Sequence, residues 1–274
     1  MSQRFAYPLV ALLLCSCTKP ASAQLENFVE VCGDVKASAS DVVNACQRAL
    51  GTGKLSKRAE AQVRTNLGVA LYDLTRYREA VDEYSAAVQA EPGLIAAYLN
   101  RARANEKLGL LREAVADYAE VLRLDPNSAD AYVGRGAMLL SNGDPARAVG
   151  DLNRAITLEP GWISPYFNRG LAYLQLRDYG RSELDFSTVI SRNSQDAGAF
   201  LNRGRARAAL GNQAAASDFD QALALAPEWG GAWFARGRYR DQLGQRDAAN
   251  GDFIRAFELG YPDPWLQKRI REIN

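Results

Sequence analysis

The chain has 274 residues, 47% of them hydrophobic, and a formal net charge of +1, so it can bury a sizeable core but has no general attraction to nucleic acid or to an anionic membrane surface. It contains no histidine, which removes the commonest general base, the usual serine and cysteine triads and most zinc sites. We therefore expect a protein that is not an enzyme, that binds no metal or cofactor and that has no nucleic-acid partner.

Residues 1–23 have the features of a secretory leader. Arg4 gives the segment a basic start, a ten-residue apolar stretch follows, and the sequence ASA offers the small residues that a signal peptidase needs, with cleavage before Gln24. The apolar stretch is too short to span a bilayer. We therefore expect an exported, periplasmic protein of bacterial type without a transmembrane span.

A second interpretation of the same segment is a lipoprotein box. In this interpretation the sequence LCSC at 14–17 directs acylation of Cys17, which becomes the first residue of the mature chain. Cys15 is an unusual residue at that place in such a box, and this favours simple cleavage. Both interpretations export the protein, the second one as a membrane-anchored lipoprotein that faces the periplasm.

The four cysteines lead to the same expectation under either interpretation. Simple cleavage removes Cys15 and Cys17, whereas lipidation removes the first and blocks the second, so only Cys32 and Cys46 remain as free thiols. Two thiols in an oxidising compartment indicate one disulfide, with two buried free cysteines as the alternative. A redox-active pair is disfavoured, because a spacing of 14 residues lacks the tight geometry of a Cys-x-x-Cys motif.

Residues 24–60 predict an N-terminal helical cap that the disulfide fastens. The sequence SASD at 38–41 lies between two short helical patterns, and Ser40 is expected to cap the second of them. The apolar residues of that second helix are Val42, Val43, Cys46 and Leu50.

From residue 61 to residue 262 the sequence is periodic, with a 34-residue register and one 33-residue interval. A period of this length is typical of stacked helix pairs. Six repeats are predicted, at 61–94, 95–128, 129–162, 163–196, 197–229 and 230–262. Prolines stop the second helix of four repeats, because the residue before a proline disfavours the helical region. These prolines are Pro92, Pro126, Pro160 and Pro227.

Three places of the repeat, counted from its first residue, govern how its two helices pack. Small residues at the eighth and twentieth places allow the helices to approach closely, and a large apolar residue at the twenty-fourth forms the inward stripe of the second helix. The eighth place holds Gly68, Ala102, Gly136, Gly170, Gly204 and Gly237. The twentieth holds Ala80, Ala114, Ala148, Ser182, Ala215 and Ala249. The twenty-fourth holds Tyr84, Tyr118, Leu152, Phe186, Phe219 and Phe253.

Residues 263–274 predict a C-terminal capping helix. Asp263 and Pro264 are suited to start it. A stack of repeats needs such a cover at each end. The residues expected to cover the last repeat are Trp265, Leu266, Ile270 and Ile273.

The repeated pattern resembles the tetratricopeptide repeat family over about 200 residues. The sequence AYLNRARANEKLGLLREAVADYAEVLRLDP at 97–126 fits the family pattern almost throughout, whereas Arg64 replaces the usual first-helix aromatic residue and Ser194 replaces a terminal proline. The resemblance implies an all-α fold, a right-handed α-solenoid of six helix pairs with a helical hairpin cap before it and a capping helix after it. It also implies a protein or peptide partner.

An arginine recurs at the seventh place of five repeats, beside the close-approach residue. These arginines are Arg101, Arg135, Arg169, Arg203 and Arg236. The same five repeats hold an aspartate at the twenty-third place, on the second helix: Asp117, Asp151, Asp185, Asp218 and Asp252. The repeat with Leu67 in place of the arginine has Glu83 there. Because pairing with a short carboxylate would satisfy an otherwise costly buried charge, we interpret these residues as a structural ion-pair ladder, with a ligand site as the alternative.

Asparagines recur at the sixth place, about 100° from the arginine around the helix. They are Asn66, Asn100, Asn168 and Asn202. The family resemblance implies that this place faces the concave side, where asparagines of some members clamp the backbone of an extended peptide, since an amide both donates and accepts. Gly134 and Ala235 interrupt the series, and a capping or solvated asparagine is the alternative.

The same resemblance assigns further residues to the peptide-binding groove. They are Leu140 and Leu174 at the twelfth place, Arg103, Arg205 and Arg238 at the ninth, and Leu99, Val133, Phe167, Leu201 and Phe234 at the fifth. Lysine is absent from the fifth place, so the carboxylate clamp of the chaperone-binding cytosolic relatives is not expected.

These features together predict a non-enzymatic scaffold of the bacterial cell envelope that binds a peptide or a partner segment in its concave groove. The first alternative is an accessory subunit of an envelope enzyme or assembly complex that docks through an edge or the convex face. A hydrolase is a third and disfavoured hypothesis, because the sequence contains no catalytic constellation.

Overall fold

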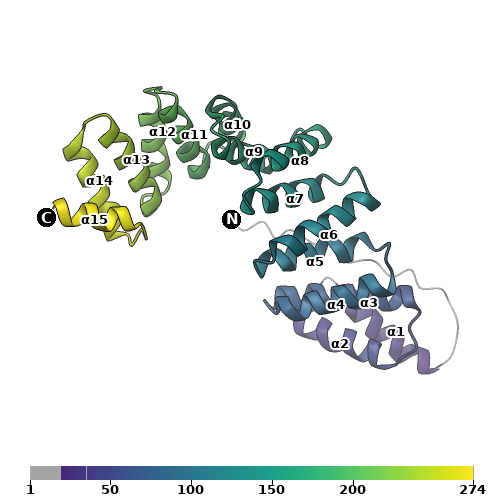
Figure 1. The fold of residues 1–274 in the computed structure, drawn as a ribbon. Coiled ribbons are helices and arrows are strands. Elements are labelled where there is room, and N and C mark those ends of the chain that lie inside the picture. The colour runs from purple at the N-terminus through teal and green to yellow at the C-terminus, as the bar shows by residue number, and fades with distance from the viewer. Residues whose placement is uncertain (1–19, 35, 274) are drawn as a thin grey trace. The chain divides into compact units, whose positions relative to one another are not determined.

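The computed structural model describes residues 20–34 and 36–273, and these form fifteen α-helices without any strand (Figure 1). The helices are α1 (Pro20–Cys32), α2 (Ala39–Gly51), α3 (Lys57–Asp73), α4 (Tyr77–Ala90), α5 (Ile95–Lys107), α6 (Leu111–Leu124), α7 (Ala129–Ser141), α8 (Pro145–Leu158), α9 (Ser164–Gln175), α10 (Tyr179–Arg192), α11 (Ala197–Ala209), α12 (Ala215–Leu225), α13 (Gly230–Gln242), α14 (Arg246–Glu258) and α15 (Pro264–Ile273). The expected all-α class is thereby confirmed. No helix in the described ranges is long and apolar enough to cross a membrane.

The chain divides into two compact units, residues 1–142 and 143–274. In the first unit each helix from α1 to α7 packs against the next, and in the second unit each helix from α8 to α15 does the same. The predicted repeats correspond to the helix pairs that begin with α3. The first of these helices starts at Lys57, four residues before the predicted repeat boundary.

Helix ends follow local chemistry. Ser56 precedes α3, and its hydroxyl oxygen accepts a hydrogen bond from the Ala59 amide at 3.2 Å, which satisfies one of the amides that a helix start leaves free. Asp196 does the same for α11 with the Ala199 amide at 2.8 Å. The helices α4, α6, α8 and α12 each end two residues before a proline. Local sequence therefore accounts for the starts of α3 and α11 and for the ends of α4, α6, α8 and α12.

The predicted small and large places meet inside each helix pair. Phe253 of α14 is fully buried against α13, and a side chain added at Gly237 would place its Cβ only 2.6 Å from the Phe253 ring. Phe186 stands in the same relation to Gly170, at 2.9 Å. A glycine at these places therefore provides the space that the aromatic ring of the second helix occupies.

Gly237 and Gly251 offer a matched pair of substitutions within neighbouring helices. Gly237→Ala should destabilise the protein by about 1–3 kcal/mol, because the Phe253 ring is held by Phe234 and Trp265 and cannot move away. Gly251→Ala should stabilise it by about 0.5–1 kcal/mol, because this glycine is exposed in the middle of α14 and an added Cβ meets nothing within 4 Å. Urea denaturation of both variants measures the difference, and a shift in the same direction for both would contradict the packing described.

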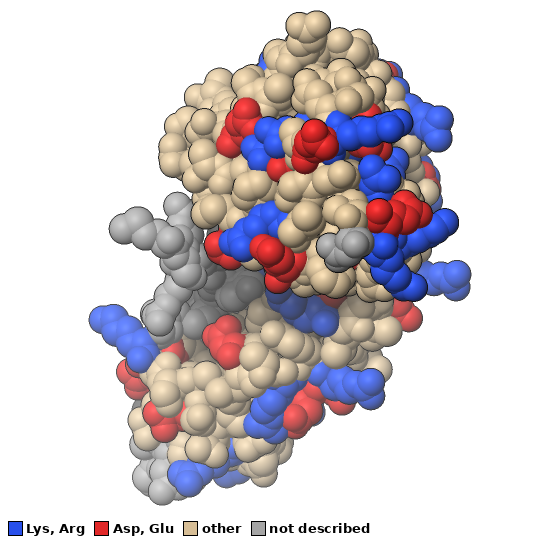
Figure 2. All heavy atoms as spheres, turned by 90° about the vertical axis from the view of Figure 1, so that its left-hand side faces the viewer, with Lys and Arg blue, Asp and Glu red and all other residues tan. Residues whose placement is uncertain are grey.

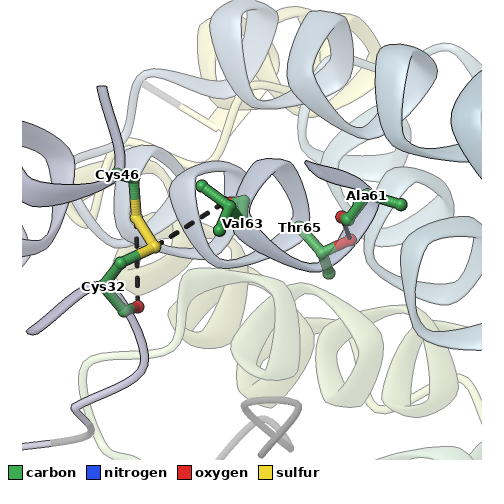
Figure 3. Close-up of a disulfide and its surroundings, with 5 residues drawn as sticks. All are labelled: Cys32, Cys46, Ala61, Val63 and Thr65. Atoms are coloured by element: carbon green, nitrogen blue, oxygen red, sulfur yellow. Dashed lines mark hydrogen bonds between the residues drawn. A yellow bond between two sulfur atoms is a disulfide. The ribbon is translucent and has the colours of Figure 1, made fainter. Parts of the chain in front are cut away.

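The N-terminal cap continues the helix-pair arrangement. Cys32 ends α1 and is joined to Cys46 of α2 in the structure, and both residues are fully buried. The Cys32 sulfur lies 3.8 Å from the carbonyl oxygen of Val63 in α3 (Figure 3). Cys46 stands 34 residues before Ala80, so it takes the twentieth place of one further repeat, where other repeats have a small close-approach residue. The disulfide thus lies at the closest approach of the two cap helices.

Other features of the two ends differ in part from expectation. Ser38, not Ser40, caps α2, because its hydroxyl accepts from the Asp41 amide at 3.1 Å. Residues 1–19 of the predicted leader, Cys17 among them, lie outside the described residues. Helix α1 begins at Pro20 and runs across the predicted cleavage point before Gln24. At the other end Leu266 and Ile270 of α15 are buried and pack in one cluster with Phe253.

Candidate functional site

The first helix of each pair lines the inner side of its unit. In the first unit α3 touches α5 and α5 touches α7, and in the second unit α9 touches α11 and α11 touches α13. Among the described residues no second helix touches the second helix of the next pair. First helices therefore lie closer together than second helices, so the inner, more tightly curved face of each unit consists of first helices.

The predicted arginine and aspartate residues meet inside the helix pairs. Each arginine places two nitrogens on the two oxygens of the aspartate in its own second helix, a bidentate geometry that suits the planar guanidinium. The four pairs that lie within one unit are Arg101 with Asp117, Arg169 with Asp185, Arg203 with Asp218 and Arg236 with Asp252. The shorter bond of each pair is 2.6, 2.6, 2.7 and 2.7 Å long, respectively. Arg135 and Asp151 belong to different units, and their pairing stays a prediction.

A third nitrogen of each arginine reaches the second helix of the preceding repeat. Arg169 Nη1 donates to the Asn153 side-chain oxygen at 2.6 Å, and Arg203 Nη1 donates to the Ser187 hydroxyl at 3.2 Å. Ser85 and Asp220 are the equivalent acceptors of Arg101 and Arg236. One guanidinium therefore links three helices, and three of its five N–H donors are already occupied, which favours a structural role over a ligand site.

The first repeat makes the same connection with different residues. Leu67 takes the place of the arginine, and Arg64, one turn earlier on α3, donates to Glu83 of α4 at 2.8 Å. Glu60 accepts from the same guanidinium at 2.9 Å. Two residues of the sequence signal this pair: Arg64, which replaces an aromatic residue, and Glu83, which stands where the other repeats have an aspartate. The donor comes from a different place on the helix, and the longer glutamate side chain reaches it.

The structure corrects the expectation that the asparagines present their amides to a peptide. Asn66 is fully buried beneath the turn after α1, and Asn100 is 3% exposed. Asn202 is also buried, where its amide nitrogen donates to the Gly198 carbonyl oxygen at 2.9 Å and its oxygen accepts from Arg205 at 3.2 Å. Asn168 alone of the four is half-buried with accessible surface. The other three are buried, which their place in the repeat by itself does not indicate.

The remaining predicted groove residues fall in both units. Leu140 of α7 is buried in the first unit, and Leu174 of α9 is packed with Phe186 in the second. Arg103 of α5 lies in the first unit, 3.7 Å from the Asp130 carboxylate of α7. The predicted groove residues therefore belong to two units, and their assembly into one groove stays a prediction.

One pocket of about 290 Å³ lies on the first helices of the second unit. Arg205 and Ala208 of α11 line it together with Phe234 and Arg238 of α13, and Tyr261, in the turn before α15, contributes a further aromatic wall. Phe234 and Tyr261 have ring centroids 5.0 Å apart. The pocket thus combines two cations with aromatic surface, and it is the candidate functional site.

Charge around the pocket is unevenly compensated. Arg238 lies over the Trp265 ring, with 4.6 Å between its guanidinium carbon and the ring centroid. Burial lowers the pKa of Arg205, and the Tyr261 phenol opposes that shift. On the face that Figure 2 presents, acidic and basic side chains are mixed. The repeat register places both arginines at the ninth place but gives no signal for Tyr261, which lies beyond the last predicted second helix.

Sequence comparison identifies the repeats. The profile described as tetratricopeptide repeat matches residues 65–116, 99–161 and 167–228, which together make up more than half of the chain. No curated protein shows a significant match to the sequence.

Solved structures show the same fold. A tetratricopeptide repeat protein from Parabacteroides merdae ATCC 43184 is 20% identical, with a TM-score of 0.69 over 90% of this chain and 97% of that one. PilW, described as a widely conserved type IV pilus biogenesis factor, is 18% identical, with a TM-score of 0.68 over 77% of this chain and 98% of that one. YrrB, described as having an unusual peptide-binding site, is 21% identical, with a TM-score of 0.61 over 71% and 98%.

Proposed function

Because this chain belongs to the tetratricopeptide repeat family, whose members act as protein-interaction scaffolds, we propose that it is a non-enzymatic scaffold of the bacterial cell envelope. It binds a segment of a partner protein on the inner face of its first helices. The observation that carries this proposal is the pocket between α11 and α13, because an aromatic hollow with two cations is suited to a protein segment. The peptide-binding site named for YrrB supports the same use of the fold.

Two observations, the leader sequence and the cysteine pair, support the cellular location in this proposal. The apolar stretch and the ASA sequence before Gln24 are typical of an export signal. The adjacent and fully buried Cys32 and Cys46 are placed for a disulfide, which persists in an oxidising compartment such as the periplasm. Export and the disulfide therefore support each other, and the pilus role named for PilW is an example of an envelope function on this fold.

Capture from the native envelope tests which surface binds the partner. The full chain is crosslinked in envelope preparations, the partner is identified by mass spectrometry, and its binding is then measured with purified components. Ala208→Trp fills the pocket and should weaken that binding several-fold. Leu210→Glu combined with Leu243→Glu alters exposed turn residues at the ends of α11 and α13 and should leave it unchanged.

The alternative is an accessory subunit that docks through an edge. Its support is a series of leucines that directly follow the first helices of the second unit: Leu176, Leu210 and Leu243 are 43%, 50% and 53% exposed. Such a series of exposed apolar side chains is a candidate contact surface. Loss of binding in the Leu210 and Leu243 double variant, with full binding by Ala208→Trp, would establish this alternative and contradict the inner-face proposal.

A further inference from the structure

Three arginines occupy the ninth place of a repeat, and they differ in their partners. Arg103 lies 3.7 Å from Asp130, which stands at the second place of the following repeat. The residue at that same place after Arg205 is Gly231, which has no side chain to offer. Arg238 belongs to the last repeat, and its neighbour from the next element is the Trp265 ring. The difference in partners therefore follows directly from these positions.

Within the described residues, neither Arg205 nor Arg238 forms an ion pair. Arg205 donates a hydrogen bond to the neutral Asn202 side-chain oxygen at 3.2 Å. Four ladder arginines, Arg101, Arg169, Arg203 and Arg236, each have in contrast a carboxylate within 2.7 Å. Among the described residues that line it, the pocket therefore has two cations and no carboxylate. An anion bound there gains more binding free energy than it would on a surface whose cations are already paired.

Gly231 could not simply be an aspartate in this fold. A Cβ at residue 231 would lie 3.2 Å from the Trp229 indole nitrogen and 3.3 Å from the Tyr261 ring. The glycine therefore allows Tyr261 to approach and form the wall of the pocket. Gly231 therefore deprives Arg205 of an internal carboxylate partner and also lets Tyr261 complete the aromatic surface beside it.

The hollow itself results from a small residue. Ala208 stands at the twelfth place of its repeat, where two earlier repeats have Leu140 and Leu174. Phe234, Tyr239 and Tyr261 line the space that a leucine would fill. An apolar side chain of a ligand would fill the place of the absent leucine. Its burial would stabilise the complex by about 25 cal/mol for each Å² of apolar surface removed from water.

We propose that this pocket binds an acidic segment of the partner protein, in which two carboxylates pair with Arg205 and Arg238 and an apolar side chain enters the hollow over Ala208. This inference rests on the proposed scaffold function and specifies its ligand. Axes of packed helices lie about 8–10 Å apart, and an extended chain advances about 3.3 Å per residue. The two acidic residues of the segment are therefore about three positions apart, with the apolar residue between them.

Selection from random peptides tests this chemistry without knowledge of the partner. Short random peptides are displayed through their C-termini, so that no terminal carboxylate is offered, and are selected on the full chain. We expect enrichment of peptides with two acidic residues around an aromatic or aliphatic one. Synthetic versions with both ends blocked should bind less tightly at higher ionic strength.

Matched variants assign the enrichment to the two arginines. R205Q combined with R238Q should weaken binding of the selected peptides by about tenfold for each arginine removed. R246Q combined with R271Q removes the same charge from exposed positions of α14 and α15 and should leave binding unchanged. R205E combined with R238E should reverse the preference, so that selection on this variant enriches basic peptides.

The outcomes separate this inference from the function on which it rests. If selection enriches peptides without acidic residues, or if acidic peptides bind R205Q combined with R238Q as tightly as the wild type, the acidic-segment inference is wrong and peptide binding itself survives. If no peptide is enriched on the whole chain, both proposals fail. If free glutarate displaces the selected peptides at equal molar concentration, the pocket is a small dicarboxylate site and the inference is wrong as well.

Discussion

Replacing Arg169 with alanine should lower the free energy of unfolding by about 2–4 kcal/mol. The guanidinium donates two hydrogen bonds to Asp185, at 2.8 and 2.6 Å, and a third to Asn153 at 2.6 Å. Asp185 is 4% exposed, so the variant leaves a buried carboxylate without its cation. The hydrogen bonds to Asp185 are also the main reason why the pKa of Arg169 is raised. Urea denaturation monitored by circular dichroism measures the loss.

A double-mutant cycle identifies the partner. Arg169→Ala combined with Asp185→Ala should cost less than the sum of the two single changes, with a coupling of about 0.5–3 kcal/mol. Asp151→Ala serves as the comparison, because Asp151 holds the same place in the preceding repeat while Arg169 donates its hydrogen bonds to Asp185 and Asn153, and it should show no coupling. Arg169→Lys should recover only part of the stability, since an ammonium group cannot make the bidentate contact. Unchanged unfolding of Arg169→Ala, without coupling to Asp185, would contradict the structural ladder and revive the ligand-site interpretation.

Removal of the cap disulfide should cost about 3 kcal/mol. The bond closes a loop of 14 residues, and in the chain-entropy model a loop of this size constrains the unfolded chain by about that amount. Cys32→Ser combined with Cys46→Ser gives the variant, and its unfolding midpoint should not respond to reductant. The unfolding midpoint of the wild type should fall towards that of the variant when reductant is added.

The bond itself is checked on the exported protein. Because both cysteines are fully buried, alkylation has to be performed after denaturation without reductant, and mass spectrometry should then find neither residue labelled. Two labelled cysteines would show that they are free thiols in the native protein. The peptides selected on the pocket of the second unit should bind the cysteine variant unchanged, which separates a stability effect from an effect on function.

Local sequence alone determined the helix pairs and their contacts. The alternation of small and large residues, such as Gly237 with Phe253, specifies where two neighbouring helices touch, and this depends only on residues within one repeat. The ladder could be predicted for the same reason, because Arg169 and Asp185 belong to one helix pair. The resemblance to the tetratricopeptide repeat rests on these same positions, and the fold class followed from it.

The tertiary structure alone decided which polar side chains are accessible. Asn66 and Asn168 hold the same place in the repeat, yet the turn after α1 covers the first, whereas the second keeps accessible surface. Repeat position specifies the direction of a side chain on its own helix, whereas its burial depends on segments outside the repeat that pack against that helix. The pocket shows the same limit, because Ala208 and Gly231 are visible in the sequence but the closure by Tyr261 arises only when the turn after α14 folds against α13.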